Sequence, residues 1–184
     1  MADKKALWND AAKAGLILGG ISLLYMVCDL LLAKVNPDNQ LAVMLAGVVS
    51  LLLWAAKFCA CIFLMRHFMK SFVNANEDAT NADSFRFGRT AALLSALIYA
   101  GGYMAYVMYV DTSVFDKSLE LMAEYPMLTS DMREQMEQMI PKMPAMTFFA
   151  NLIYCWMFGT VLSAILSRNI PSRNPFQNNT TNDQ

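Results

Sequence analysis

The sequence predicts an all-α membrane protein. We expect a bundle of four transmembrane helices, with an extracytoplasmic pair of amphipathic helices between the third and fourth spans. The chain of 184 residues is 57% hydrophobic and only 16% charged, whereas soluble domains have about 25% charged residues. Four stretches also reach the ~20 mostly apolar residues that a helix needs to cross a bilayer.

The predicted spans cover about residues 14–33, 41–65, 90–110 and 146–166. The first span follows a basic N-terminus, as a cleaved signal peptide would. Its apolar run is longer than the usual hydrophobic region of such a peptide, however, and no A-x-A-like cleavage site closes it. We therefore predict a retained anchor and a single membrane domain over residues 1–168.

The Lys and Arg residues predict the orientation of the bundle. Nine of the fourteen lie in the N-terminus, the segment 66–89 or the tail, and four lie in the other two connections. Because an excess of Lys and Arg marks the cytoplasmic side, we predict that both termini lie in the cytoplasm. The connection 111–145 then lies outside, and the polar tail 169–184 is predicted to be disordered.

The outer connection has the pattern of two short amphipathic helices. Ser113 followed by Asp116 matches a capping box, Pro126 ends the first helix, and a second runs between Ser130 and Pro141. The apolar stripe of the second helix consists of Met132, Met136, Met139 and Ile140.

Two interpretations of these methionines are open. Flexible methionines suit irregular apolar surfaces, such as the bilayer, the tops of the spans or a partner protein. Thioethers also select Cu(I), but this connection has no His or Cys, and helical amphipathicity already explains the spacing. We favour packing and predict no metal.

Three polar residues are predicted at a similar depth below the outer surface. Asp29 and Tyr106 lie ~6 Å deep and Asn151 ~7.5 Å deep, at the rise of an α-helix. They are candidates for a small outward-facing pocket. The alternative is that each reaches interfacial water or holds two helices together.

Lys57 is the fourth pocket candidate, because ionisable residues within a span are functional hypotheses by default. It lies ~12 Å from the inner end of its span and roughly 18 Å along the axis from Asp29, so we expect no direct pair. Its stem is expected to extend toward the cytoplasm or to contact a helix carbonyl. The alternative is a role with a coupling ion or a lipid phosphate.

Basic residues flank the second and third spans on the predicted cytoplasmic side. They suit anionic lipid headgroups and comprise Arg66, His67, Lys70, Arg86 and Arg89. The sequence contains no Ser-His-Asp or Cys-His set, phosphate loop or H-E-x-x-H helix, and its four cysteines lie in apolar runs. We therefore predict no enzyme activity, disulfide or cofactor, and the net charge of −1 gives no indication of nucleic-acid binding.

Gly15 and Gly19 are four residues apart in the first span, a spacing that allows close packing of a second helix. The stretches "AAKAGLILGGISLLY", "SFRFGRTAALLSALIYAGGYMAYVMYVD" and "GTVLSAILSR" resemble a domain-of-unknown-function family of small integral-membrane proteins of Bacteroidetes-type bacteria. The matching positions are Gly15, Gly19, Phe85, Gly88 and Asp111. The resemblance implies four spans, an inner-membrane location and gene neighbours that encode a polyprenyl-phosphate glycosyltransferase. It carries over no activity and no functional residues.

We therefore expect a non-catalytic accessory or scaffolding protein of cell-envelope biogenesis. Its partner would be such a glycosyltransferase, another membrane protein or a second copy of the chain. The alternative is a small transporter or lipid-binding protein that uses the polar pocket.

Overall fold

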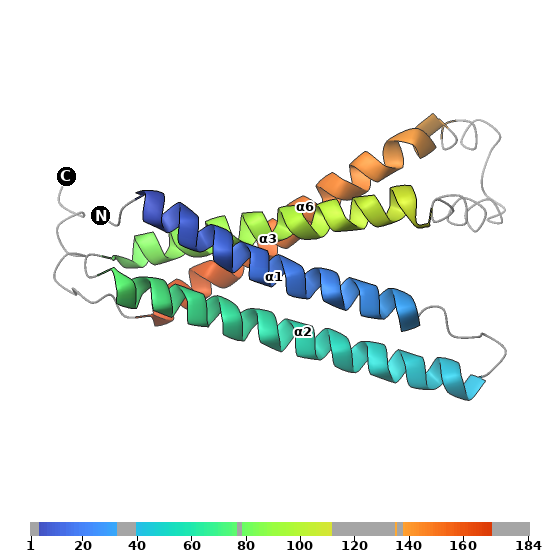
Figure 1. Cartoon of the computed structure of the whole chain (residues 1–184), viewed down its shortest axis with the longest axis horizontal. Helices are drawn as coiled ribbons and strands as arrows, with labels where there is room; N and C mark the ends of the chain where they lie inside the picture. Colours follow the sequence, from blue (N-terminus) through green and yellow to red (C-terminus); the bar gives the residue numbers. More distant parts are fainter. Residues whose placement is uncertain (1–3, 33–39, 77–78, 112–134, 136–137, 171–184) are drawn as a thin grey trace.

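The computed structural model describes residues 4–32, 40–76, 79–111, 135 and 138–170 (Figure 1). It contains four long α-helices: α1 (Lys4–Leu32), α2 (Gln40–Ala75), α3 (Asn81–Tyr109) and α6 (Met143–Asn169). A short 3-10 helix, η1 (Ile140–Lys142), leads into α6. No strand occurs among the residues described, and the all-α fold class is confirmed.

Each of the four helices is long and apolar enough to cross a membrane. Their low charge lets them lie in lipid, and a helix satisfies its own backbone hydrogen bonds there. The four predicted spans coincide with these helices to within one residue or fall inside them. The chain is a multi-pass membrane protein.

Helices α2 and α3 differ from the prediction at one end of the bundle. The segment 66–89 has the sequence pattern of a connection, but α2 continues to Ala75 and α3 begins at Asn81. Thr80 caps α3: its hydroxyl accepts a hydrogen bond from the Asp83 backbone N–H, and the Asp83 carboxylate accepts one from the Thr80 N–H. Hydropathy marks where a helix leaves lipid, whereas capping and packing decide where the helix ends.

Helix α3 is central. It packs along α1 on one side and α6 on the other, while α2 packs mainly on α1 and makes slight contact with α3 and α6. The start of α1, the end of α6 and the turn between α2 and α3 lie at one end of the bundle (Figure 1). We call this the basic end. At the opposite, far end, α1 and α2 diverge from α3 and α6 (Figure 1).

The tightest packing is at the basic end. The rings of Phe72 in α2 and Phe87 in α3 stack with centroids 4.7 Å apart, and both side chains are buried. The core around them also includes residues of α1 and α6: Ala11, Ala14, Leu18, Leu166 and, just after α6, Ile170. Large apolar side chains elsewhere on the helices are exposed, as expected where lipid is the solvent.

Small residues bring the helices close together. A Cβ atom added at Gly15 would lie 2.7 Å from the Leu94 Cβ, and one added at Gly19 would lie 2.9 Å from the Ile98 Cβ. The structure thus places both predicted packing glycines in the α1–α3 contact. At Gly88 an added Cβ would lie 2.7 Å from the Ser163 Oγ of α6, so α3 uses glycine on this side too.

Two predicted regions lie outside the described residues. These are most of the outer connection, including Ser113, Asp116, Met132 and Met136, and the tail from residue 171. Within the described part, Met139 is helical and exposed. Regular α-helix gives way to the 3-10 turn around Pro141, which is where a proline is expected to end it. Asn169, the first residue of the predicted tail, is the last residue of α6.

Candidate functional site: a cavity among the four helices

The three polar residues predicted at one depth bind separate partners. Asp29 accepts a 2.5 Å hydrogen bond from Ser50 of α2. The Tyr106 hydroxyl donates a hydrogen bond of 3.4 Å to the Asp111 carboxylate. The Asn151 side-chain amide donates to the Thr147 carbonyl within α6.

The structure does not bring Asp29, Tyr106 and Asn151 together, and none of the three lines the cavity described below. A common depth fixes only the position of a residue along the bundle axis, and not the direction in which its side chain points. The rotation of each helix decides which neighbour its polar group meets. The Asp29–Ser50 bond is of the kind that holds two helices together.

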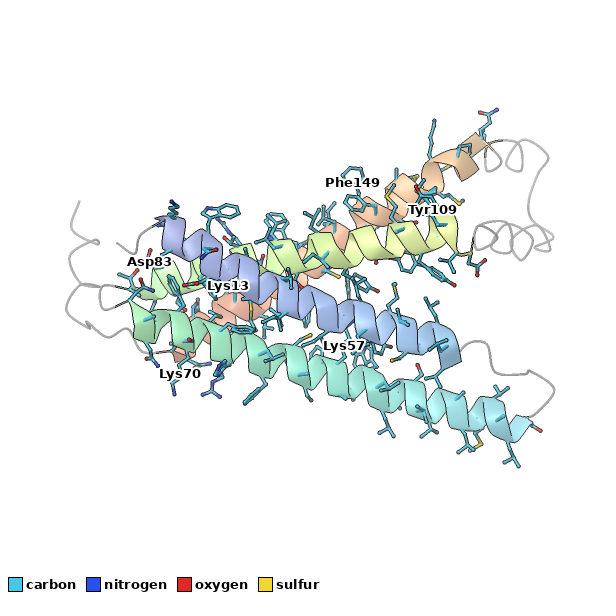
Figure 2. All side chains as sticks on the ribbon, in the orientation of Figure 1. Lys13, Lys57, Lys70, Asp83, Tyr109 and Phe149 are labelled. Atoms are coloured by element: carbon cyan, nitrogen blue, oxygen red, sulfur yellow. The ribbon has the colours of Figure 1, made fainter. Side chains whose placement is uncertain are left out.

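Lys57 points into the bundle. Its Nζ atom lies 4.7 Å from the centre of the Tyr25 ring and 5.3 Å from that of Tyr99, within the ~6 Å range of cation–π contacts. Figure 2 shows Lys57 about midway along the bundle, between α1 and α2. The two aromatic faces, from α1 and α3, take the place of the expected contact with the cytoplasm or with a carbonyl.

A cavity of about 220 Å³ lies next to Lys57 and receives side chains from all four helices. Most of its wall is apolar. Lys57 is the one charged residue in this lining, and no carboxylate belongs to it. The other polar groups of the lining are the hydroxyls and thiols of Ser22, Cys61, Ser95, Tyr99, Tyr154 and Cys155.

The wall between α2 and α6 reaches the surface of the protein. Trp54 and Phe58 of α2 and Tyr154 and Phe158 of α6 line the cavity, yet Trp54 is 52% and Tyr154 is 72% exposed. The Phe58 and Phe158 rings are 5.6 Å apart and bridge the two helices, while Trp54 stacks on Phe58. Helices α2 and α6 make only slight contact with each other, so these four aromatic residues form most of the boundary of the cavity on this side. We call them the aromatic wall.

The basic residues predicted to contact lipid headgroups gather at the basic end. Arg66, His67 and Lys70 lie on the last turns of α2, and Arg86 and Arg89 lie on the first turns of α3. All five are exposed. Arg86 approaches the buried Asp83 at 3.8 Å, and Figure 2 shows Lys13, Lys70 and Asp83 at this same end.

Sequence reasoning did not identify Ser22, Tyr25 or the aromatic wall. One signal was available: Ser22, Tyr25 and Asp29 are spaced by three and four residues, so they share one face of α1. Ser50 and Lys57 are spaced by seven on α2, which also gives a shared face. A polar face on each of two consecutive spans indicates that the two helices meet there.

Residues 13–168 match the model of a family described as "Protein of unknown function (DUF4199)". No curated protein and no solved structure matches the chain. The match spans all four helices, from Lys13 in α1 to Arg168 in the last turn of α6. The chain therefore belongs to the DUF4199 family of proteins of unknown function.

Proposed function

We propose that this protein is a non-catalytic protein of the bacterial inner membrane that binds a lipid chain in the cavity among its four helices. The observation that carries the proposal is the aromatic wall, where residues that line the cavity are also exposed on the lipid-facing surface. A chain in the bilayer would enter the cavity there without crossing water.

The size and lining of the cavity support a lipid chain as its occupant. Pockets for drug-sized molecules typically have ~300–1,000 Å³, whereas this cavity has about 220 Å³. It therefore suits one end of a single-chain lipid, with the remainder left in the bilayer. The lining contains no His and no carboxylate, the side chains that most often act as general acids and bases, and this favours binding over hydrolysis.

The basic end supports the proposed orientation. Eight described Lys and Arg residues lie there, outside the apolar part of the helices: Lys4, Lys5, Lys13, Arg66, Lys70, Arg86, Arg89 and Arg168. The positive-inside rule assigns such an end to the cytoplasm. Both termini would then be cytoplasmic.

Photo-crosslinking with two single-chain lipids, one with a diazirine near the headgroup and one with a diazirine near the end of the chain, tests the proposal. In the purified full-length protein, labelled peptides should concentrate on the aromatic wall. Ser95→Leu, which adds volume to the lining of the cavity, should reduce this labelling severalfold. Ala105→Leu, on an exposed face of α3, serves as the matched control and should leave labelling unchanged.

Thermal unfolding of both variants shows whether they are folded. Labelling spread evenly over exposed residues such as Leu52, and insensitive to Ser95→Leu in a folded protein, contradicts a binding cavity.

We propose a scaffolding role in cell-envelope biogenesis as a second candidate. It is favoured by α2, which has 36 residues but slight contact with α3 and α6. The polyprenyl-phosphate glycosyltransferase suggested by the family resemblance is one candidate partner. A photoreactive residue at Leu52 of α2 should crosslink to a second protein or a second copy, whereas one at Leu97 of α3 should not. Crosslinks to lipid only, at both positions, count against this role.

A further inference from the structure

We propose that Lys57 is the counter-ion for the acidic headgroup of a single-chain amphiphile, which inserts through the aromatic wall. This inference rests on the proposed lipid-binding cavity and adds the chemical class of the ligand. The shared chemistry is one anionic group, carboxylate or phosphate, at the end of one alkyl chain.

The first argument is the charge of Lys57. Lys57 is half-buried, and a charge within the apolar part of a span is costly and is normally paired. Among the described residues, the contacts of its Nζ atom are the rings of Tyr25 and Tyr99, and no carboxylate lies within ion-pair distance. Asp29, which is one helical turn from Tyr25, is hydrogen-bonded to Ser50 instead. The site therefore carries a positive charge that an anion would complement.

The second argument is the set of donors beside Lys57. Ser95 and Tyr99 of α3 line the same cavity, and neither hydroxyl has a hydrogen-bond partner among the described residues. Hydroxyl and ammonium groups both donate hydrogen bonds, and bonds to charged acceptors are the stronger ones. Together with Lys57 these hydroxyls offer donors from two helices to one anionic group.

The third argument is shape. The cavity of about 220 Å³ holds a headgroup and the beginning of a chain. The aromatic wall separates this space from lipid, and its Trp54, Phe58 and Phe158 rings would contact the chain as it leaves between α2 and α6. The small volume excludes a lipid with two chains and a large headgroup from entering whole. A carboxylate on the transmembrane helix of a partner protein is the competing occupant, and the test below separates the two.

The experiment measures binding of a matched ligand series to the full-length protein, purified in a neutral detergent. The series is hexadecanoate, hexadecyl phosphate, hexadecanol and hexadecyltrimethylammonium, each in competition with radiolabelled hexadecanoate. We expect at least one of the two anions to bind about tenfold or more tightly than the alcohol, since bonds to charged groups contribute most of such a difference. The cation should bind most weakly. Comparison of the two anions distinguishes carboxylate from phosphate.

Variants assign the effect to Lys57. Lys57→Met should bring the anions to within about twofold of the alcohol, and Lys57→Arg, which keeps the charge, should retain most of the preference. Lys70→Gln removes an exposed cation from the same helix and should change nothing. If Lys57→Met does not fold, the comparison of ligands on the unmodified protein still decides whether the site prefers an anionic headgroup.

Three results would overturn the inference. The first is equal binding of the anions and the alcohol by the unmodified protein. The second is an anion preference that survives in Lys57→Met. The third is loss of a copurifying protein in Lys57→Met without change in ligand binding, which would identify a partner's carboxylate as the counter-ion. If lipid-chain crosslinking at the aromatic wall persists in any of these cases, the proposed function stands and only the ligand class is wrong.

Discussion

The Ser50 hydroxyl donates a 2.5 Å hydrogen bond to the Asp29 carboxyl group and so joins α1 to α2 at membrane depth. Polar contacts between membrane helices typically contribute only ~0.6 kcal/mol and at most ~1.7 kcal/mol. We expect a coupling energy in this range between Asp29→Ala and Ser50→Ala, measured as a double-mutant cycle of unfolding free energies in mixed micelles. Asp29→Ala paired with the distant Thr90→Ala is the control. Additive effects of Asp29→Ala and Ser50→Ala would contradict a stabilising bond.

At Gly88 the backbone of α3 lies so close to α6 that no side chain fits between them. An added Cβ would meet Ser163 at 2.7 Å from its Oγ and 2.9 Å from its Cβ, and such overpacking typically costs ~1–3 kcal/mol. We expect Gly88→Ala to lower the free energy of unfolding by this amount. At Gly20 an added Cβ has no atom within 4 Å, so Gly20→Ala should be neutral or slightly stabilising because alanine favours helix. Equal stabilities of the two variants would show that α3 and α6 do not pack as described.

The stacked pair of Phe72 and Phe87 holds the basic end together. Phe87 is 1% exposed, and removing a buried Phe ring typically costs ~3–5 kcal/mol. Phe87→Ala should therefore lower the thermal unfolding temperature strongly. Phe63, 70% exposed on α2, supplies the matched control, and Phe63→Ala should shift that temperature little. A similar response of the two variants would argue against a core at this end.

The membrane orientation is testable with single cysteines in a variant that lacks the four native ones. Asn169→Cys, at the exposed end of α6, should react with a membrane-impermeant maleimide only after the cells are broken. Gln138→Cys, exposed at the far end, should react in intact cells. The reverse pattern would place the basic end outside and overturn the proposed orientation.

Much of the fold could be predicted because the signal for a membrane span is local. The length and apolar composition of about twenty consecutive residues decide whether a segment crosses lipid, and the four helices of the structure are where those runs occur. The extension of α2 to Ala75 and the start of α3 at Asn81 were harder to predict. Their Phe72–Phe87 core depends on a contact between two helices. The Thr80–Asp83 capping box, by contrast, is present in the sequence itself.

The site depended on tertiary structure. The sequence determined which polar residues lie within the spans and at roughly what depth, since depth follows from the rise of a helix. It did not determine the rotation and tilt of each helix, which are set by packing against neighbours, for example at Gly15, Gly88 and Phe87. Those contacts turn Asp29 toward Ser50 and Lys57 toward Tyr25 and Tyr99. Side chains at one depth meet only when the helices that carry them are also rotated toward each other, and here packing between the helices sets that rotation.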